Sequence, residues 1–227
     1  NVLESEDVQS SIFACRKLGV KIKKIKPKFY KIYGKGLGSL TAKKNSEINF
    51  GNSGTLARLL IGVLSTNPGI EVNISGDHSL NKRSMRKLFN LMKKFGTNFF
   101  PKNKYNFPIK LISSKIPLGI FYKAGVSAQL KSAAMLAGLN SYGNTTILET
   151  QKSRDHTENI LINNKKVMNI KGKKKRIIRI FGKNNLNPLK MNIPCDPSTA
   201  AFFSALTLLN KKSNLKIKNI GLNKTRI

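Results

Sequence analysis

The 227-residue sequence has two cysteines, no tryptophan, and only ten acidic residues against 42 lysines and arginines. Cys15 and Cys195 lie far apart and lack metal-site spacing, which excludes a disulfide framework and a cysteine-based zinc site. No apolar run reaches the roughly 18 residues that a membrane span needs, and the sequence does not open on a signal peptide. We therefore expect a cytoplasmic protein that has no metal, no cofactor and no membrane partner.

The formal net charge of +32 makes a nucleic-acid-binding protein one hypothesis. The lysines are scattered among asparagines and isoleucines, however, which indicates a compositional bias rather than a stripe that follows phosphates. The one basic run, residues 173–176, precedes an alternating strand pattern and is interpreted as a solvated loop at the entry of a hairpin. No aromatic residues interleave with this run as a single-strand stacking platform requires. A generic polyanion binder stays open as an alternative.

A repeat organises the sequence, with three similar segments spaced roughly 70 residues apart. Each consists of a helix that is apolar on almost all sides, a short turn and a strand. The helices are expected at residues 55–64, 129–139 and 200–209, and the strands at 72–74, 145–148 and 215–217. Because such helices must be covered on all sides, we expect them to be buried, to lie side by side and to point the same way.

A second kind of helix, with a single apolar stripe, is expected at residues 8–18 and 83–95. Each stops at a glycine, Gly19 or Gly96, of the kind that ends helices. Aligning these two glycines places the first residues inside an earlier copy of the repeat, so we expect the sequence to be a fragment. Strands at 20–23 and 177–181 alternate in polarity, which predicts sheets with one face in water.

Each apolar helix begins with a polar cluster suited to capping. These clusters are Asn52-Ser53-Gly54-Thr55, Ser127-Ala128-Gln129 and Asp196-Pro197-Ser198-Thr199. Parallel helices bring their unsatisfied N–H groups and positive dipole ends to one region, and such a region binds anions such as phosphate. The plainer interpretation, that the clusters are only helix caps, stays open.

Five motifs, in order, resemble the EPSP synthase (3-phosphoshikimate 1-carboxyvinyltransferase) family of enolpyruvyl transferases. They lie at residues 50–55 with Arg58, 76–83, 127–133, 153–158 and 196–201, and the resemblance covers essentially the whole sequence. It implies an α/β (α+β) fold of repeated βαβαββ units, with buried parallel helices under surface sheets, as about half of a two-domain inverse α/β barrel. Residues 1–192 would be most of the first domain, with one partial and two complete units, and 193–227 the start of the second.

By this resemblance the parent protein joins the 5-hydroxyl of shikimate 3-phosphate to phosphoenolpyruvate by addition and elimination, releasing phosphate. The residues matched to the shikimate 3-phosphate site are Ser127, Ala128, Gln129, Ser153 and Arg154. The residues matched to the phosphoenolpyruvate site are Gly54, Arg83 and again Gln129, with Asn52 and Thr55 shaping the turn. The resemblance also implies a monomeric full-length protein without nucleic-acid partners.

Several plainer interpretations stay open beside this assignment. Gly54 would merely relieve a tight turn, and Arg83 would be a surface residue at a helix start. His78 and His156 are interpreted as structural or solvent-facing. Asp155 and Glu158 are interpreted as first-turn helix carboxylates.

Departures from the family pattern are also present. Ser84 stands where the family usually has proline, which is expected to loosen that turn. Gly54 is the unsubstituted form of a position where larger residues weaken glyphosate binding, so we expect a glyphosate-sensitive enzyme. The family's acid–base residues match nothing here, so we expect no catalytic residue within these 227 residues and little activity from them alone. UDP-N-acetylglucosamine enolpyruvyl transferase is the alternative enzyme, disfavoured by the motifs at 76–83 and 153–158.

Overall fold

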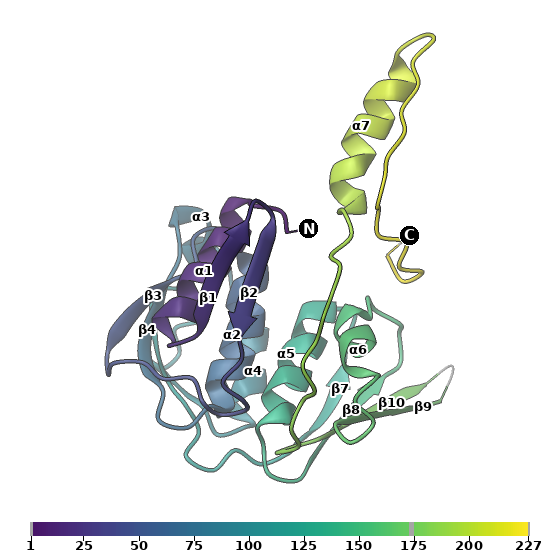
Figure 1. Cartoon of the computed structure of the whole chain (residues 1–227). Coiled ribbons are helices and arrows are strands. Elements are labelled where there is room, and N and C mark those ends of the chain that lie inside the picture. Colours follow the sequence, from purple (N-terminus) through teal and green to yellow (C-terminus); the bar gives the residue numbers. More distant parts are fainter. Residues whose placement is uncertain (1, 173–174, 227) are drawn as a thin grey trace.

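The computed structural model describes residues 2–172 and 175–226. Its first elements are the helix α1 (Glu6–Lys17) and the strands β1 (Lys21–Lys26) and β2 (Phe29–Tyr33) (Figure 1). The two strands pair as an antiparallel hairpin. Gly19 follows α1 with φ at +83°, the left-handed conformation that a helix-ending glycine supplies. This helix–strand–strand order is the same as the last three elements of each unit that follows.

The first complete unit forms a four-stranded sheet in the order β3-β4-β6-β5. Its elements are β3 (Ser46–Asn49), α2 (Gly54–Thr66), β4 (Glu71–Ser75), α3 (His78–Lys82), α4 (Arg86–Lys93), β5 (Asn98–Phe100) and β6 (Ile109–Ile112). β3 and β4 are parallel, as a helical crossover requires, whereas β6 is antiparallel to both of its neighbours.

The second unit repeats this topology with the strand order β7-β8-β10-β9. Its elements are β7 (Phe121–Ala124), α5 (Ala128–Leu139), β8 (Asn144–Glu149), α6 (His156–Leu161), β9 (Met168–Lys171) and β10 (Arg176–Phe181). Again the first two strands are parallel and the other pairings antiparallel. The βαβαββ unit is therefore confirmed twice, after one partial copy.

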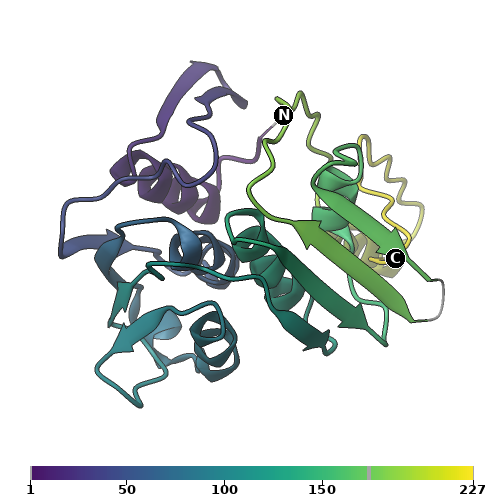
Figure 2. The same ribbon diagram turned by 90° about the horizontal axis from the view of Figure 1, so that it is seen from below.

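The helices α2 and α5 lie side by side (Figure 2). They run parallel, because hydrogen bonds join them both near their N-termini and near their C-termini. Near their C-terminal ends, the hydroxyl of Thr66 donates to the carbonyl of Ala137 at 3.1 Å. The two helices approach closely at Gly62, where an added Cβ would lie 2.7 Å from the carbonyl oxygen of Ala133. The predicted burial and common direction of these two helices are confirmed.

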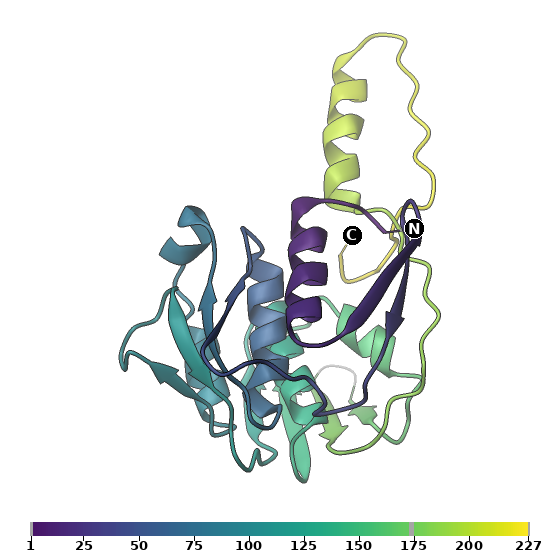
Figure 3. The same ribbon diagram turned by 60° about the vertical axis from the view of Figure 1, so that its left-hand side comes forward.

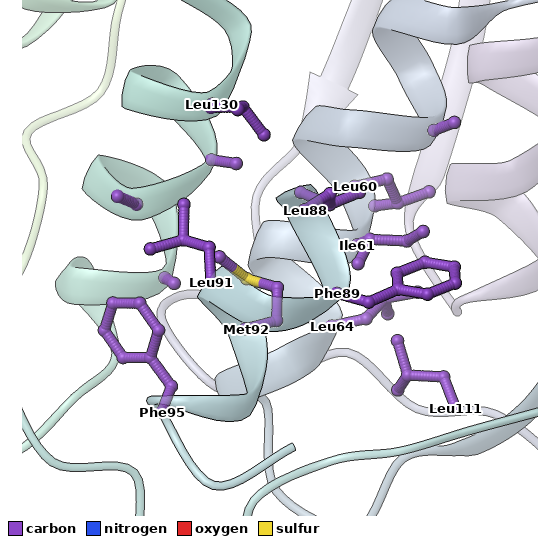
Figure 4. Packing of buried hydrophobic residues seen from close by; sticks show 14 of the residues in the cluster. Leu60, Ile61, Leu64, Leu88, Phe89, Leu91, Met92, Phe95, Leu111 and Leu130 are labelled. Atoms are coloured by element: carbon purple, nitrogen blue, oxygen red, sulfur yellow. The ribbon is translucent and has the colours of Figure 1, made fainter. Parts of the chain in front are cut away.

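The core is a continuous apolar cluster that joins α2, α4 and α5. Figure 4 shows Leu60 and Ile61 of α2 facing Phe89 and Met92 of α4, with Leu130 of α5 at the far side of the cluster (Figure 4). All five side chains are buried. Because this cluster spans both units, it fixes the positions of the N-termini of α2 and α5.

The helix expected at 83–95 begins later than predicted, at Arg86. The helix α3 ends at Lys82, Arg83 is extended with φ −72° and ψ 132°, and α4 begins at Arg86. The physical cause is a non-local bond, because the Met85 N–H donates to the carbonyl of Tyr105 at 2.7 Å instead of to a preceding turn. The predicted apolar stripe is confirmed, because its side chains are buried. The predicted helix-ending glycine is also confirmed, because Gly96 follows α4 in the left-handed conformation.

The third apolar helix, α7 (Pro197–Leu209), forms but is not covered, so the prediction of burial is wrong for it within the described chain. Phe202 is 78% exposed and Leu208 is 87% exposed, and α7 projects beyond the two units (Figure 3). The expected strand at 215–217 is also wrong. The described residues after α7 return in the opposite direction without a paired strand, and their one β-bridge joins Cys195 and Ile220.

The basic run at 173–176 falls partly outside the described residues, which exclude Lys173 and Lys174. Lys175 is exposed, and Arg176 starts β10 of the β9–β10 hairpin, as expected. Among the described helices, none is long and apolar enough to cross a membrane. In the same ranges, no three His, Cys, Asp or Glu side chains are grouped as metal ligands.

Candidate functional site

The N-termini of α2 and α5 meet through a side-chain bond, since Gln129 Nε2 donates to Thr55 Oγ1 at 2.8 Å. Both helices begin with a serine cap. Ser53 Oγ accepts from the Leu56 N–H at 3.2 Å, and Ser127 Oγ accepts from the Leu130 N–H at 3.4 Å. The predicted capping clusters are confirmed for these helices. Their parallel dipoles place two positive ends side by side, which favours a bound anion.

A groove of about 210 Å³ runs beside the first turn of α5. Its lining comes from three segments: Thr55 and Leu59 of α2; Ala128, Gln129 and Ser132 of α5; and Arg154 before α6 with His156 and Thr157 in the first turn of α6. Arg154 is exposed, and no described carboxylate lies within ion-pair distance of it. The groove therefore combines a guanidinium with an amide and hydroxyls, a donor set suited to a phosphate ester.

A second cationic group surrounds Gly54 at the start of α2. An added Cβ on Gly54 would lie 2.9 Å from Arg58 Nη1 and 3.0 Å from Arg83 Nη1. Arg58 Nη1 donates to the Gly54 carbonyl at 2.9 Å. Burial, followed by repulsion from Arg83, lowers the pKa of Arg58. Two guanidinium groups repel each other here, beside a glycine backbone that carries no side chain. An anion between them would be stabilised.

Asn52 links this cationic group to a carboxylate that the motif analysis did not assign. Its Nδ2 donates to Asp77 Oδ2 at 2.6 Å, and its Oδ1 accepts from Arg83 Nη2 at 3.3 Å. The N–H of Leu80, followed by the Asn52 amide, holds the pKa of Asp77 below its usual range. Asn52 therefore orients Arg83, a more specific role than the turn shaping expected for it.

Ser153 lies beneath the groove rather than in it. Its side chain is buried, and its hydroxyl donates to Glu149 Oε1 at 2.9 Å, while its backbone N–H donates to the same oxygen at 3.0 Å. The hydroxyl proton is thus engaged within the protein. The family resemblance matches both adjacent residues to the phosphate site. Arg154 lines the groove, whereas Ser153 stabilises the turn beneath it.

A buried group of four charges lies behind this turn, formed by Lys131, Glu149, Glu158 and Arg176. Glu158 lies in the first turn of α6, which confirms its interpretation as a first-turn helix carboxylate. It is 1% exposed, however, and pairs with Lys131 instead of facing solvent. Burial would raise the pKa of Glu149, but donation from Lys131 and Ser153 outweighs it and leaves that pKa below its usual range. A lysine inside an apolar helix pattern is the sequence signal that points to such a group.

The remaining titratable candidates lie at the periphery. His78, in the first turn of α3, is exposed, and His156 is an exposed residue at the groove edge. Asp155 accepts hydrogen bonds from Asn223 at 2.9 Å and from Thr225 at 3.0 Å. Burial raises the pKa of Asp155, but these two donors outweigh burial and leave it below its usual range. Asp155 therefore joins the groove turn to the C-terminal segment.

Comparisons with known proteins all point to one family. The model of EPSP synthase (3-phosphoshikimate 1-carboxyvinyltransferase) matches residues 1–227. A 3-phosphoshikimate 1-carboxyvinyltransferase of Novosphingobium aromaticivorans is 38% identical over 99% of this chain and 51% of its own length. The equivalent protein of Zymomonas mobilis is 37% identical over 99% of this chain and 50% of its own length.

The solved structures agree with the sequence comparison. EPSP synthase from Acinetobacter baumannii superposes with a TM-score of 0.82 at 31% identity, covering 98% of this chain and 49% of that one. This chain thus spans about half the length of the relatives it matches.

Proposed function

This chain belongs to the EPSP synthase family, and we propose that the full-length protein transfers the enolpyruvyl group of phosphoenolpyruvate to the 5-hydroxyl of shikimate 3-phosphate, releasing phosphate. The observation that carries this proposal is the pairing of the α2 and α5 N-termini through Gln129 and Thr55. Cationic side chains lie on both sides of that pair: Arg154 in the groove, and Arg58 with Arg83 at Gly54. Two polyanionic substrates need two such clusters a short distance apart.

The α5 side is suited to the sugar phosphate. Ser127 and the backbone of Ala128 stand at a helix N-terminus, where N–H groups and the dipole favour phosphate oxygens. Arg154 presents a planar fork that holds two oxygens at once. Gln129 stands between the two clusters, where its amide would contact both the ring and the enolpyruvyl group.

The α2 side is suited to phosphoenolpyruvate. The absence of a side chain at Gly54 leaves room for the anion to approach the backbone, and Arg83 neutralises its charge. Arg58 supplies a second guanidinium that the motif analysis quoted without assigning a role. Asn52 fixes the direction of Arg83 through its bonds to Arg83 and Asp77.

The reaction places definite demands on these groups. In the addition step the 5-hydroxyl oxygen bonds to the central carbon of phosphoenolpyruvate, the methylene carbon gains a proton and the hydroxyl loses one. In the elimination step the methyl carbon loses a proton and the phosphate departs. The arginines and helix N-termini of this chain would stabilise the negative charges throughout. We assign no described residue as the general acid or base.

We extend the proposal to the organisation of the full-length protein. Residues 1–192 would be most of its first domain, and 193–227 the start of its second. We propose that it acts as a cytoplasmic monomer without nucleic-acid partners. A DNA-binding protein would instead lose DNA affinity steeply with added salt, without competition from shikimate 3-phosphate.

Thermal stability tests the proposal directly. Shikimate 3-phosphate is expected to raise the melting temperature of the full-length protein, because a ligand that binds only the folded state stabilises it. Arg154→Ala is expected to abolish the rise. Arg179→Ala, at an exposed position on β10, is the matched control and is expected to retain it. No rise with the unmodified protein, or an equal rise with Arg154→Ala, would contradict the proposal.

A further inference from the structure

Four charged side chains meet beneath the groove, three of them buried and the fourth, that of Arg176, 13% exposed. Lys131 Nζ lies 2.7 Å from Glu149 Oε1 and 2.6 Å from Glu158 Oε1, and Lys131 is fully buried. Arg176 Nη1 lies 2.9 Å from Glu149 Oε2. Two positive and two negative charges balance, so removal of any one leaves the group with a net charge.

These four residues come from four different elements of the second unit. Lys131 lies in the first turns of α5, Glu149 ends β8, Glu158 lies on α6 and Arg176 begins β10. Lys131 therefore ties α5 to both the end of β8 and α6. A second link between α5 and α6 is the 2.7 Å hydrogen bond between the hydroxyls of Ser132 and Thr157.

The groove residues Gln129 and Arg154 are close in the sequence to residues that belong to this charged group or bind it. Gln129 precedes Lys131 by two positions on α5. On the other side, Glu149 accepts both the N–H and the hydroxyl of Ser153, and Arg154 is the next residue. The distance between the α5 N-terminus and the Arg154 guanidinium is thus set by the position of Lys131 between Glu149 and Glu158.

Stability alone does not account for such a group. The cost of removing charges from water consumes most of their mutual attraction, and well-packed apolar residues of similar volume often stabilise a protein as much or more. The adjacent interior of α5 is apolar, with Ala133, Ala134 and Met135 fully buried. Ion pairs, unlike apolar contacts, fix the relative direction and register of the elements that they join.

We propose that Lys131 and Glu158 are positioning residues that set the affinity for the phosphate end of shikimate 3-phosphate, by holding Arg154 at a fixed place relative to the N-terminus of α5. This inference rests on the proposed function and deepens it. The phosphoenolpyruvate cluster around Gly54 comes from α2 and from Arg83 after α3, in the other unit, and forms no ion pair with this group, so it is expected to be little affected.

The test compares charge-balanced variants of the full-length protein. Lys131→Met with Glu158→Gln removes one charge of each sign at nearly constant volume and leaves Glu149 paired with Arg176. Lys110→Met with Glu71→Gln is the matched control, because it removes an ion pair of 2.6 Å on the other unit whose side chains are partly exposed. The measurements are the melting temperature and the separate KM values for the two substrates.

We expect the double variant at Lys131 and Glu158 to melt close to the unmodified protein. Its KM for shikimate 3-phosphate is expected to rise about tenfold or more, while its KM for phosphoenolpyruvate changes less than about threefold. An unchanged KM for shikimate 3-phosphate, or an equal rise of both KM values, would overturn the proposal. If the double variant does not fold, the same comparison is decisive with Glu158→Gln alone, which keeps Lys131 paired with Glu149. Absence of activity in the unmodified full-length protein would instead refute the proposed function.

Discussion

Gln129 and Thr55 are joined by a 2.8 Å hydrogen bond although 74 positions separate them in the sequence. The bond connects equivalent places, because each residue lies in the first turn of the central helix of its βαβαββ unit. A glutamine there offers a donor and an acceptor to any ligand that lies between the two helix ends. The repeated fold thus brings the first turns of two equivalent helices together.

Replacement of Gln129 should therefore affect both substrates. Gln129→Leu keeps the side-chain size but removes the amide, so we expect kcat/KM to fall about tenfold to a hundredfold for both substrates, corresponding to the loss of one or two hydrogen bonds. Steady-state kinetics of the full-length protein would measure this. Gln9→Leu, at an exposed glutamine on α1, serves as the control and should leave both values unchanged. A fall for only one substrate would argue against the bridging role.

Substitution of Gly54 should act on the phosphoenolpyruvate side. Gly54→Ala adds a methyl group 2.9 Å from Arg58 and 3.0 Å from Arg83, so the guanidinium groups must move. We expect the KM for phosphoenolpyruvate to rise about tenfold and inhibition by glyphosate to weaken. Gly34→Ala is the control, since no heavy atom lies within 4 Å of an added Cβ there. Unaltered competition between glyphosate and phosphoenolpyruvate in Gly54→Ala would contradict this prediction.

Gly62 should matter for stability rather than for binding. A methyl group at this position would lie 2.7 Å from the carbonyl oxygen and 2.9 Å from the Cα of Ala133, and these backbone atoms move only if α2 and α5 separate. We expect Gly62→Ala to lower the free energy of unfolding by about 1–3 kcal/mol. Chemical denaturation would measure the loss, with Gly125→Ala, at an open position, as the neutral control. Equal stability of the two variants would be inconsistent with this helix contact.

The stability of the protein should decrease in acid through Glu149. Its pKa is lowered in the folded state, so its contribution is fully present above its unfolded-state pKa of about 4.3 and is lost as the pH falls through the lowered folded-state pKa. We expect the free energy of unfolding to decline below about pH 4, and to decline less steeply in Glu149→Gln. Denaturation curves at several pH values would measure both slopes. Glu47→Gln, at an exposed position on β3, is the control; identical slopes for the Glu149→Gln variant and the unmodified protein would contradict the assignment.

Local patterns were sufficient to predict the helices that carry the site. The apolar runs around Leu60 and Ala134 predict buried helices, and the serine caps at Ser53 and Ser127 predict where these helices begin. The residues proposed to bind phosphate, and the βαβαββ order, came from the family resemblance rather than from the patterns.

Features that depend on distant partners were not predictable in the same way. The break at Arg83 follows from the hydrogen bond between Met85 and Tyr105, which are 20 positions apart. The burial of Glu158 depends on its meeting Lys131, and a linear pattern does not reveal which glutamate a buried lysine will contact. Likewise, the apolar character of α7 indicates a need for cover but not which part of a protein supplies it.

The most direct test of the central claim is phosphate release by the full-length protein given both substrates. We predict that phosphate appears only when shikimate 3-phosphate and phosphoenolpyruvate are both present, in a one-to-one ratio with the enolpyruvyl product. Arg154→Ala is predicted to raise the KM for shikimate 3-phosphate at least about tenfold, as expected for loss of a charge-assisted bidentate contact. Phosphate release that is independent of shikimate 3-phosphate, or a full-length protein that consumes neither substrate, would contradict the account.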